Sequence, residues 1–230
     1  MTHLALLPSP LLGPAAWSRV AVPLRERGLR VTQVGLPERI TSVEDVLTGF
    51  VAALPAAEPV VLVPHSNAGL YVAAVAARVR VRGAVYVDAG LPSLTASAPT
   101  APGWLRERLG DLAGPDGTLP PWTEWWPEAD VAGLFPDPAA RREVEREQPR
   151  LPLAYFDAEV PTPAGWEQLP AAYLAFGDAY ADERAEAVRR GWPVSTLRGG
   201  HLHMLVDPAG VADALTGLIA AWADGAGDPG

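Results

Sequence analysis

The sequence predicts an α/β fold, a three-layer sandwich in which helices cover both faces of a mostly parallel sheet of about six strands. Short apolar runs that stop at Pro or Asp predict the strands, because a strand buried on both faces is apolar along its whole length. Segments with helical periodicity separate these runs. Strands that alternate with helices at this spacing need right-handed crossovers, so we expect them to run parallel. We expect one domain, residues 1–230.

The composition excludes several classes of function. The chain of 230 residues has a net charge of −9, whereas nucleic acids and anionic membranes attract a basic surface. It has no Cys, so a disulfide framework, a thiolate metal site and a Cys nucleophile are excluded. No apolar run approaches the roughly 18 residues of a membrane span. We expect a cytoplasmic enzyme with no nucleic-acid or membrane partner, and the oligomeric state stays open.

The first half of the chain carries the clearest strand and helix signals. An apolar run at residues 4–7 stops at Pro8 and predicts the first strand. Thr41 and Glu44 form a capping box ahead of an apolar stripe at helical spacing. Further strands are expected at residues 29–34, 60–63 and 83–87. Helices are expected at residues 15–27, 43–54 and 70–79, the first of them burying Trp17, Val20, Val22 and Leu24.

The alternation breaks between residues 91 and 170. This segment holds 14 of the 25 prolines and 5 of the 8 tryptophans, with short helical pieces at residues 104–112 and 138–148. A crossover in the core does not tolerate so many helix breakers, whereas a lid folded over the active-site face does. We therefore expect a lid at residues 91–170. Trp122, Trp125 and Trp126 either form an apolar wall over the site or pack the lid onto the body.

The sheet resumes after this segment. Strands are expected at residues 172–176 and 194–197, with a helix at 182–190 between them. The last helix spans residues 207–222, with Asp207 as its N-cap and Pro208 in its first turn. Residues 223–230 are expected to form a frayed tail.

Ser66 stands where a buried strand turns into a helix. Such a turn exposes a serine Oγ above the sheet and leaves the N–H of the next residue, Asn67, to bind an oxyanion. In the usual Gly-x-Ser-x-Gly pattern, Pro64 replaces the first glycine and Gly69 follows one residue late. A serine that only caps the following helix is the alternative. We take Ser66 as the candidate nucleophile.

A histidine follows a glycine pair near the end of the chain. His201 comes directly after Gly199 and Gly200, and a serine hydroxyl needs such a base to become a nucleophile. Serine first, acid between and histidine last is the order of α/β-hydrolases. His203 is the rival base, or a residue that binds substrate or fills the core. The His-x-His spacing lacks further ligands, so we expect no metal.

With these two segments, the chain resembles the α/β-hydrolase superfamily. Residues 85–89 and the His201 segment resemble its small esterase and hydroxynitrile-lyase-like members in particular. The resemblance implies a lid between the strand that ends at Asp88 and the next strand. It also implies a second oxyanion donor after the first strand, where Pro10 has no N–H. The backbone of Leu11, or less favourably Ser9, is left for that role.

The resemblance leaves the acid of the triad open. In most relatives the acid follows the strand that ends here at Phe176, three residues beyond a glycine. Three residues beyond Gly177 stands Tyr180, which is not a carboxylate. Asp178 is the first choice, and Asp88 is its rival because some lipases take their acid from the end of the preceding strand. Some carboxylate must orient the imidazole.

These residues predict a cofactor-free serine hydrolase for an ester, thioester or lactone of an apolar small molecule. Ser66 attacks, His201 transfers the proton, and Asp178 or Asp88 orients the imidazole. One alternative is a non-hydrolytic enzyme of the same fold, a lyase or cyclase that uses the same pocket. The other is a ligand-binding protein without catalysis, in which Ser66 and His201 lie beyond hydrogen-bond distance.

Overall fold

A six-stranded sheet in the order β2-β1-β3-β4-β7-β8 forms the centre of the molecule. The computed structural model describes residues 2–225 and the side chains of residues 2–221. Every pairing in this sheet is parallel. The strands are β1 (His3–Leu7), β2 (Arg30–Gln33), β3 (Val60–Ser66), β4 (Val81–Ala89), β7 (Ala171–Ala175) and β8 (Val194–Thr196).

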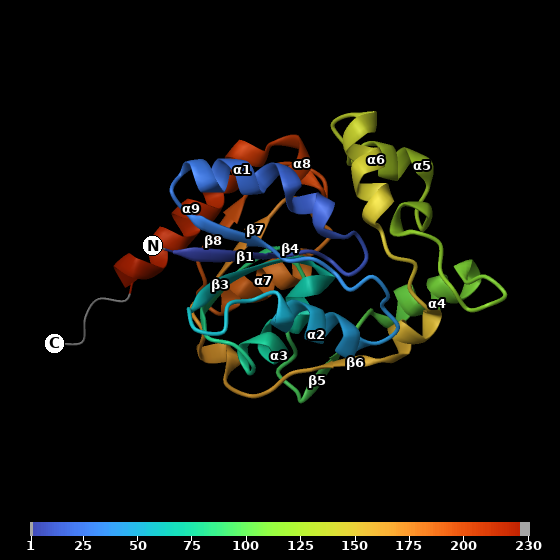
Figure 1. Cartoon of the computed structure of the whole chain (residues 1–230), viewed down its shortest axis with the longest axis horizontal. Coiled ribbons are helices and arrows are strands. Elements are labelled where there is room, and N and C mark those ends of the chain that lie inside the picture. Colours follow the sequence, from blue (N-terminus) through green and yellow to red (C-terminus); the bar gives the residue numbers. More distant parts are fainter. Residues whose placement is uncertain (1, 226–230) are drawn as a thin grey trace.

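Helices cover both faces of the sheet, which confirms the three-layer sandwich (Figure 1). On one face lie α1 (Ser18–Glu26) and α9 (Pro208–Gly225), and on the other lie α2 (Val43–Ala52) and α3 (Val72–Ala76). The remaining helices of this body are α7 (Ala181–Arg189) and α8 (His203–Val206). The expected tail begins inside α9, and its residues 226–230 lie outside the described part of the chain.

The core lies along β1, β3 and β4. All seven residues of β3 are buried, and β1 pairs with it from Leu4 opposite Val61 to Leu7 opposite Pro64. Helices on both faces remove these strands from water, which explains why their sequences are apolar without alternation. The parallel order brings the carboxyl ends of β1, β3 and β4 to one edge of the sheet.

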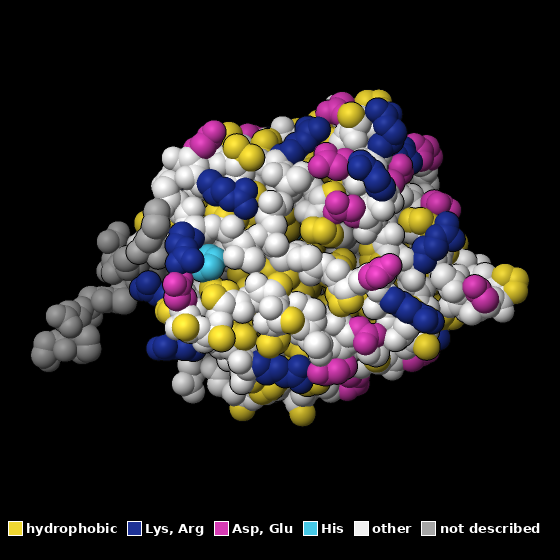
Figure 2. Space-filling model, in the orientation of Figure 1, with side chains coloured by type: hydrophobic (Ala, Val, Ile, Leu, Met, Phe, Trp, Pro, Cys, Tyr) yellow, Lys and Arg dark blue, Asp and Glu magenta, His cyan; other side chains and the backbone are white. Residues whose placement is uncertain are grey.

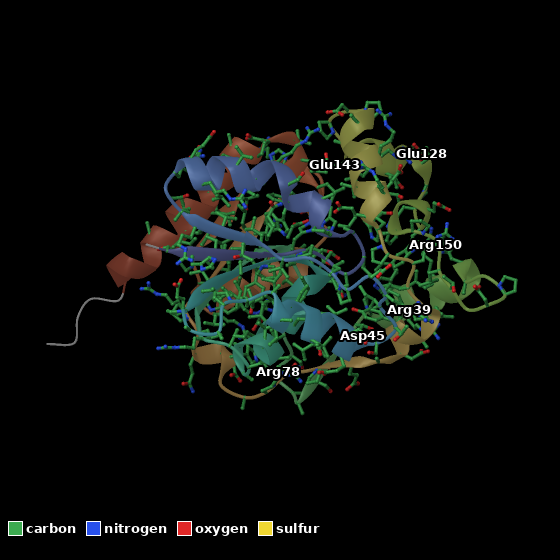
Figure 3. All side chains as sticks on the ribbon, viewed as in Figure 1. Arg39, Asp45, Arg78, Glu128, Glu143 and Arg150 are labelled. Carbon is green, nitrogen blue, oxygen red and sulfur yellow. The ribbon has the colours of Figure 1, made fainter. Side chains whose placement is uncertain are left out.

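Two local expectations are wrong in detail. The capping box of α2 uses Ser42 and Asp45 instead of Thr41 and Glu44, with Asp45 N donating to Ser42 Oγ over 3.2 Å. Hydrogen bonds from Thr41 and Ser42 lower the pKa of Asp45 to about 2, and Asp45 lies at the first turn of α2 (Figure 3). In α1, Val22 is 54% exposed, because it stands two residues from both Val20 and Leu24, which are buried, and so lies on the opposite side of the helix.

The segment between β4 and β7, residues 91–170, is called the insertion here. It carries α4 (Gly103–Leu112), α5 (Glu128–Ala132), α6 (Pro138–Glu147), and β5 (Ser97–Pro99) paired antiparallel with β6 (Glu159–Pro161). Its helices lie beyond the carboxyl ends of the strands (Figure 1). The amide of Ala15 donates to Glu147 Oε2 over 2.8 Å, so α6 is tied to the turn ahead of α1.

The face drawn in Figure 2 carries acidic and Arg side chains interspersed, with hydrophobic side chains between the body and the insertion. Glu128 and Glu143 lie on α5 and α6 (Figure 3), and Glu128 pairs with Arg141. Within residues 2–225, none of the helices is both long enough and apolar enough to span a membrane.

Candidate active site

The expected turn from strand to helix is present at Ser66. β3 ends at this residue, which adopts φ 58° and ψ −130°, a conformation that costs a residue other than Gly about 1–3 kcal/mol. The next residues form the 3-10 turn η2 (Asn67–Tyr71), and α3 begins only after it. This is the backbone geometry of a nucleophile elbow. Ser66 is 3% exposed, so the elbow is almost closed off from solvent.

Gly69 makes this turn possible. A Cβ atom at Gly69 would lie 1.9 Å from the carbonyl oxygen of Gly90, the residue after β4. The amide of Gly90 in turn donates to the carbonyl oxygen of Ser66 over 3.1 Å. The ends of β3 and β4 therefore touch backbone to backbone, and only a residue without a side chain fits between them.

His201 and Asp88 meet at the same edge of the sheet. Nδ1 of His201 lies 2.7 Å from Oδ2 of Asp88, and Asp88 is 1% exposed. An ionised carboxylate only accepts hydrogen bonds, so Nδ1 carries the proton and Nε2 keeps its lone pair. The other carboxylate oxygen, Oδ1, accepts from the amide of Phe176 over 3.2 Å. The carboxylate thus sets both the tautomer and the orientation of the imidazole.

The environment of Asp88 keeps it ionised. Burial acts to raise its pKa, but the hydrogen bond and charge of His201 and the hydrogen bond from the Phe176 amide together lower the pKa below its ordinary value. Asp88 also has φ 42°, and with Ser66 it is one of the two described residues other than Gly that have a positive φ. Ser66 is the last residue of β3 and Asp88 the last but one of β4, so both strained residues lie at the carboxyl ends of adjacent strands. Backbone strain of this kind clusters at functional sites.

The sequence favours Asp178 over Asp88 as the partner of His201, and the structure reverses that order. The side chain of Asp178 is 91% exposed and lies 3.4 Å from Arg184 on α7. The turn after β7 directs this carboxylate to solvent, whereas β4 directs Asp88 inward. The position three residues beyond Gly177 faces the site instead, and it holds Tyr180.

Tyr180 is the site residue that the sequence did not indicate. Its hydroxyl lies 3.2 Å from Ser66 Oγ, and its ring centroid lies 5.6 Å from that of His201. Among the described residues, Ser66 Oγ hydrogen-bonds to Tyr180 and has no hydrogen bond with His201. The only available signal was its place in the chain, where the resemblance puts an acid.

His65, the residue before Ser66, supports His201 from below. Its Nε2 donates to the carbonyl oxygen of His201 over 3.0 Å, and the two rings stack with centroids 4.5 Å apart. Burial, and then the charge of His201, lower the pKa of His65 to about 3. The ring is therefore neutral at neutral pH, and it holds the histidine loop without adding charge.

The expected oxyanion amides belong to Asn67 and Leu11. Asn67 is the first residue of η2, so its N–H has no partner within that turn. Its side chain is held from the insertion, because Nδ2 donates to Thr100 O over 2.7 Å and Oδ1 accepts from Tyr155 over 3.3 Å. The Leu11 amide donates to Ser9 Oγ over a long 3.3 Å. An arriving oxyanion has to compete with that hydroxyl.

Trp122, Trp125 and Trp126, three of the five tryptophans of the insertion, differ in position. The ring of Trp122 lies 6.1 Å from that of His201, centroid to centroid. Trp126 stands behind it, 6.5 Å from Trp122, with the Arg108 guanidinium over its ring. Trp125 packs on Phe156, and its Nε1 donates to Pro120 O within the insertion. Trp122 contacts the site, and Trp125 packs the insertion itself.

His203 lies beside the site rather than in its centre. Its ring packs edge-on against Phe176 at 5.5 Å, and its side chain fills the space that a Cβ at Gly199 would need. Within residues 2–221, no three His, Asp or Glu side chains gather closely enough to hold a metal ion. A surface hollow of about 400 Å³ lies elsewhere, lined by Val51, Leu54, Ala56 and residues 77–80.

The comparisons with known proteins agree with this architecture. A model of the alpha/beta hydrolase family matches residues 4–214, so the chain belongs to that family. A comparison with curated protein sequences gives no match. An extracellular alpha/beta-hydrolase from a Paenibacillus species superposes with a TM-score of 0.75 at 16% identity, covering 95% of this chain and 99% of that one.

Two plant proteins are also similar in structure. Tomato methylketone synthase I, complexed with 2-tridecanone, has a TM-score of 0.73 at 18% identity over 96% of this chain and 98% of its own. A methylesterase from Arabidopsis has a TM-score of 0.68 at 15% identity over 96% and 99%. At these identities the likeness shows the fold.

Proposed function

We propose that this protein is a serine hydrolase that cleaves a carboxylic ester, thioester or lactone of an apolar small molecule. Ser66 is the nucleophile, His201 the general base and Asp88 the residue that orients it. The observation that carries the proposal is the 2.7 Å contact of His201 Nδ1 with a buried carboxylate, beside a serine on a strained elbow. Asp178, at 91% exposure, has no part in this triad.

The reaction follows from the protonation states. Asp88 holds the proton on Nδ1 of His201, so Nε2 accepts the proton of Ser66 while Oγ attacks the carbonyl carbon. The tetrahedral intermediate then breaks its bond to the alcohol oxygen, which takes the proton from Nε2. Water repeats these steps on the acyl-enzyme and releases the acid. Catalytic hydrogen bonds often tighten only when substrate is bound. In this structure the Ser66 hydroxyl hydrogen-bonds to Tyr180, and in the proposed reaction it turns to His201 Nε2 when substrate binds.

The backbone amides of Asn67 and Leu11 are the proposed donors to the oxyanion. Each such donor contributes roughly 3 kcal/mol to transition-state stabilisation in serine hydrolases. The loop after β1 lies beside the elbow, since Leu7 pairs with Pro64 in the sheet. The hydrogen bonds of the Asn67 side chain to Thr100 and Tyr155 keep its backbone in place.

The surroundings favour an apolar substrate. The Trp122 ring lies over His201, and the insertion covers an elbow that is only 3% exposed. An aromatic wall binds a neutral acyl or alcohol group by removing apolar area from water. The net charge of −9 opposes anionic substrates. In this proposal the insertion is a lid, and substrate enters when it moves.

Labelling with a fluorophosphonate probe tests the nucleophile. The probe phosphonylates an activated serine, so the wild type is expected to label and Ser66→Ala is expected not to. Ser97→Ala is a matched control, because that serine lies on β5 and its hydroxyl donates a hydrogen bond to the Glu159 carboxylate. A folded wild type that stays unlabelled contradicts the proposal.

A non-hydrolytic reaction in the same pocket is the second candidate. The observation that favours it is the Ser66 hydroxyl held by Tyr180 instead of His201, together with structural likeness to a synthase as well as to esterases. A panel of p-nitrophenyl esters separates the two candidates. A hydrolase releases p-nitrophenol from at least one of them, and a lyase or cyclase releases almost none.

A further inference from the structure

Tyr180 occupies a distinctive place in the site. It precedes α7, and its hydroxyl lies 3.2 Å from Ser66 Oγ while its ring leans on His201 at a centroid distance of 5.6 Å. It thus contacts the two groups that exchange a proton in the proposed reaction. An acid was expected after the carboxyl end of β7, but the side chain that reaches the nucleophile from there is the phenol of Tyr180.

The direction of this hydrogen bond follows from acidity. A phenol is a far stronger acid than a serine hydroxyl, so the favoured arrangement has Tyr180 donate and Ser66 Oγ accept. Burial raises the pKa of Tyr180 well above its ordinary value, with the charges of Asp88 and Glu183 acting in the same direction and the hydrogen bond with Ser66 acting against them. The phenol therefore keeps its proton at any working pH, and the proton of Ser66 remains free for His201.

We propose that Tyr180 is a further catalytic residue, which donates a hydrogen bond to Ser66 Oγ and accelerates deacylation more than acylation. This inference rests on the proposed hydrolase function. It assigns a role in the reaction to a side chain outside the triad and outside the oxyanion amides.

The difference between the two half-reactions comes from their ground states. Before acylation, Oγ belongs to a hydroxyl and accepts the Tyr180 hydrogen bond well, so the bond is present in the ground state and in the transition state. In the acyl-enzyme, Oγ is an ester oxygen whose lone pairs are drawn into the carbonyl, and it accepts poorly. Only interactions that strengthen on the way to the transition state accelerate a step. Deacylation therefore gains more from Tyr180.

Deacylation is the hydrolysis of the ester bond between the acyl group and Ser66 Oγ. Water adds to the acyl carbon and gives a proton to Nε2 of His201. The tetrahedral intermediate then breaks its bond to Oγ, on which negative charge develops, and Nε2 returns the proton to Oγ. Tyr180 donates to Oγ throughout and keeps its own proton. The products are the free acid and the restored Ser66 hydroxyl.

Stopped-flow kinetics with a short-chain p-nitrophenyl ester test the role of Tyr180. The burst of p-nitrophenol reports acylation, and mass spectrometry of the acyl-enzyme after removal of excess ester reports deacylation. Tyr180→Phe keeps the ring against His201 and removes the donor. We expect deacylation to slow about 10-fold and acylation less than about 3-fold, so that kcat and KM fall together.

Tyr86→Phe is the matched control, because Tyr86 is a buried tyrosine that stacks on Trp192 at 5.5 Å, away from Ser66. It is expected to leave both rates unchanged. A Tyr180→Phe enzyme with unchanged deacylation, or with both half-reactions slowed equally, overturns the inference. A wild type without probe labelling or turnover overturns the proposed function itself, which is a different result.

Replacement of Tyr180 by 3-fluorotyrosine supplies a second test that preserves the fold. Fluorine makes the phenol a stronger acid and a better donor, so deacylation is expected to accelerate about 2-fold with little change in acylation. Slower deacylation in this variant overturns the inference.

Discussion

The ends of β4 and β7 differ sharply, although the strands are neighbours and run parallel. Asp88 lies within the last two residues of β4, is 1% exposed and bonds to His201. Asp178 follows β7 by three residues, has a side chain that is 91% exposed, and lies 3.4 Å from the Arg184 guanidinium. Two carboxylates at the carboxyl ends of neighbouring strands thus have different environments. Burial and a specific partner distinguish the candidate catalytic acid from the solvent-exposed carboxylate.

The cause of the difference is the backbone. Asp88 is the last residue but one of β4 and has φ 42°, and its side chain turns inward to the Phe176 amide and His201. After β7 the chain turns toward α7, and that turn gives the inward position to Tyr180. The end of one strand supplies the acid, and the end of its neighbour supplies a phenol that meets the nucleophile.

The strongest test of this contrast is a pair of substitutions, Asp88→Asn and Asp178→Asn. The first removes the charge that fixes the His201 tautomer and is expected to lower kcat/KM by about 1,000-fold or more. The second removes only a solvated partner of Arg184 and is expected to change kcat/KM less than about 2-fold. Steady-state hydrolysis of a p-nitrophenyl ester measures both.

Circular dichroism and thermal melting show whether each of these variants is folded. If Asp178→Asn loses more activity than Asp88→Asn, the contrast between the two strand ends fails and the acid has to be reassigned.

A second test concerns His65, which lies near the end of β3 and hydrogen-bonds to the carbonyl oxygen of His201. Its pKa is lowered from 6.5 to about 3 in the folded protein, so between these values the unfolded chain binds the proton and the folded protein does not. Folding stability therefore falls as the pH falls. His65→Gln keeps an N–H donor without the titration, and we expect the wild type to lose about 2 kcal/mol more than this variant between pH 6 and 4.

Urea unfolding at several pH values measures this difference, and titrations shared by both proteins cancel in it. Parallel pH dependences in the two proteins contradict the buried, neutral state of His65.

The smallest expected effects are those of substitutions at two tryptophans of the insertion, one at the site and one away from it. Trp122 faces His201 and Trp125 packs on Phe156, so the same change at each has a different result. Trp122→Phe removes apolar area at the site and is expected to raise KM for a long-chain ester about 3-fold relative to an acetyl ester. Trp125→Phe is expected to keep that ratio and to lower the unfolding free energy by about 1 kcal/mol.

The ratio of the two KM values isolates chain-length preference from any general loss of activity. A shift of this ratio in Trp125→Phe, with none in Trp122→Phe, would remove Trp122 from the substrate site.

Much of the body was predictable because its signals are local. The apolar runs of β1 and β3, the turn at Ser66 and the glycine pair before His201 are each a contiguous stretch of a few residues. Errors of detail arose where neighbours compete, as when Ser42 caps α2 in place of Thr41. The insertion was recognised by its prolines, yet the separate positions of its tryptophans were not predictable, because long-range packing sets them.

The parallel sandwich, the elbow at Ser66 and the histidine loop could be predicted from the chain alone, since each depends on backbone preferences of contiguous residues. Two contacts could not be predicted in this way: Asp88 bonds to His201 across 113 positions, and Tyr180 hydrogen-bonds to Ser66 across 114 positions. Strand register and the direction of the turn after each strand determine where these side chains point. Both are set by packing across the sheet.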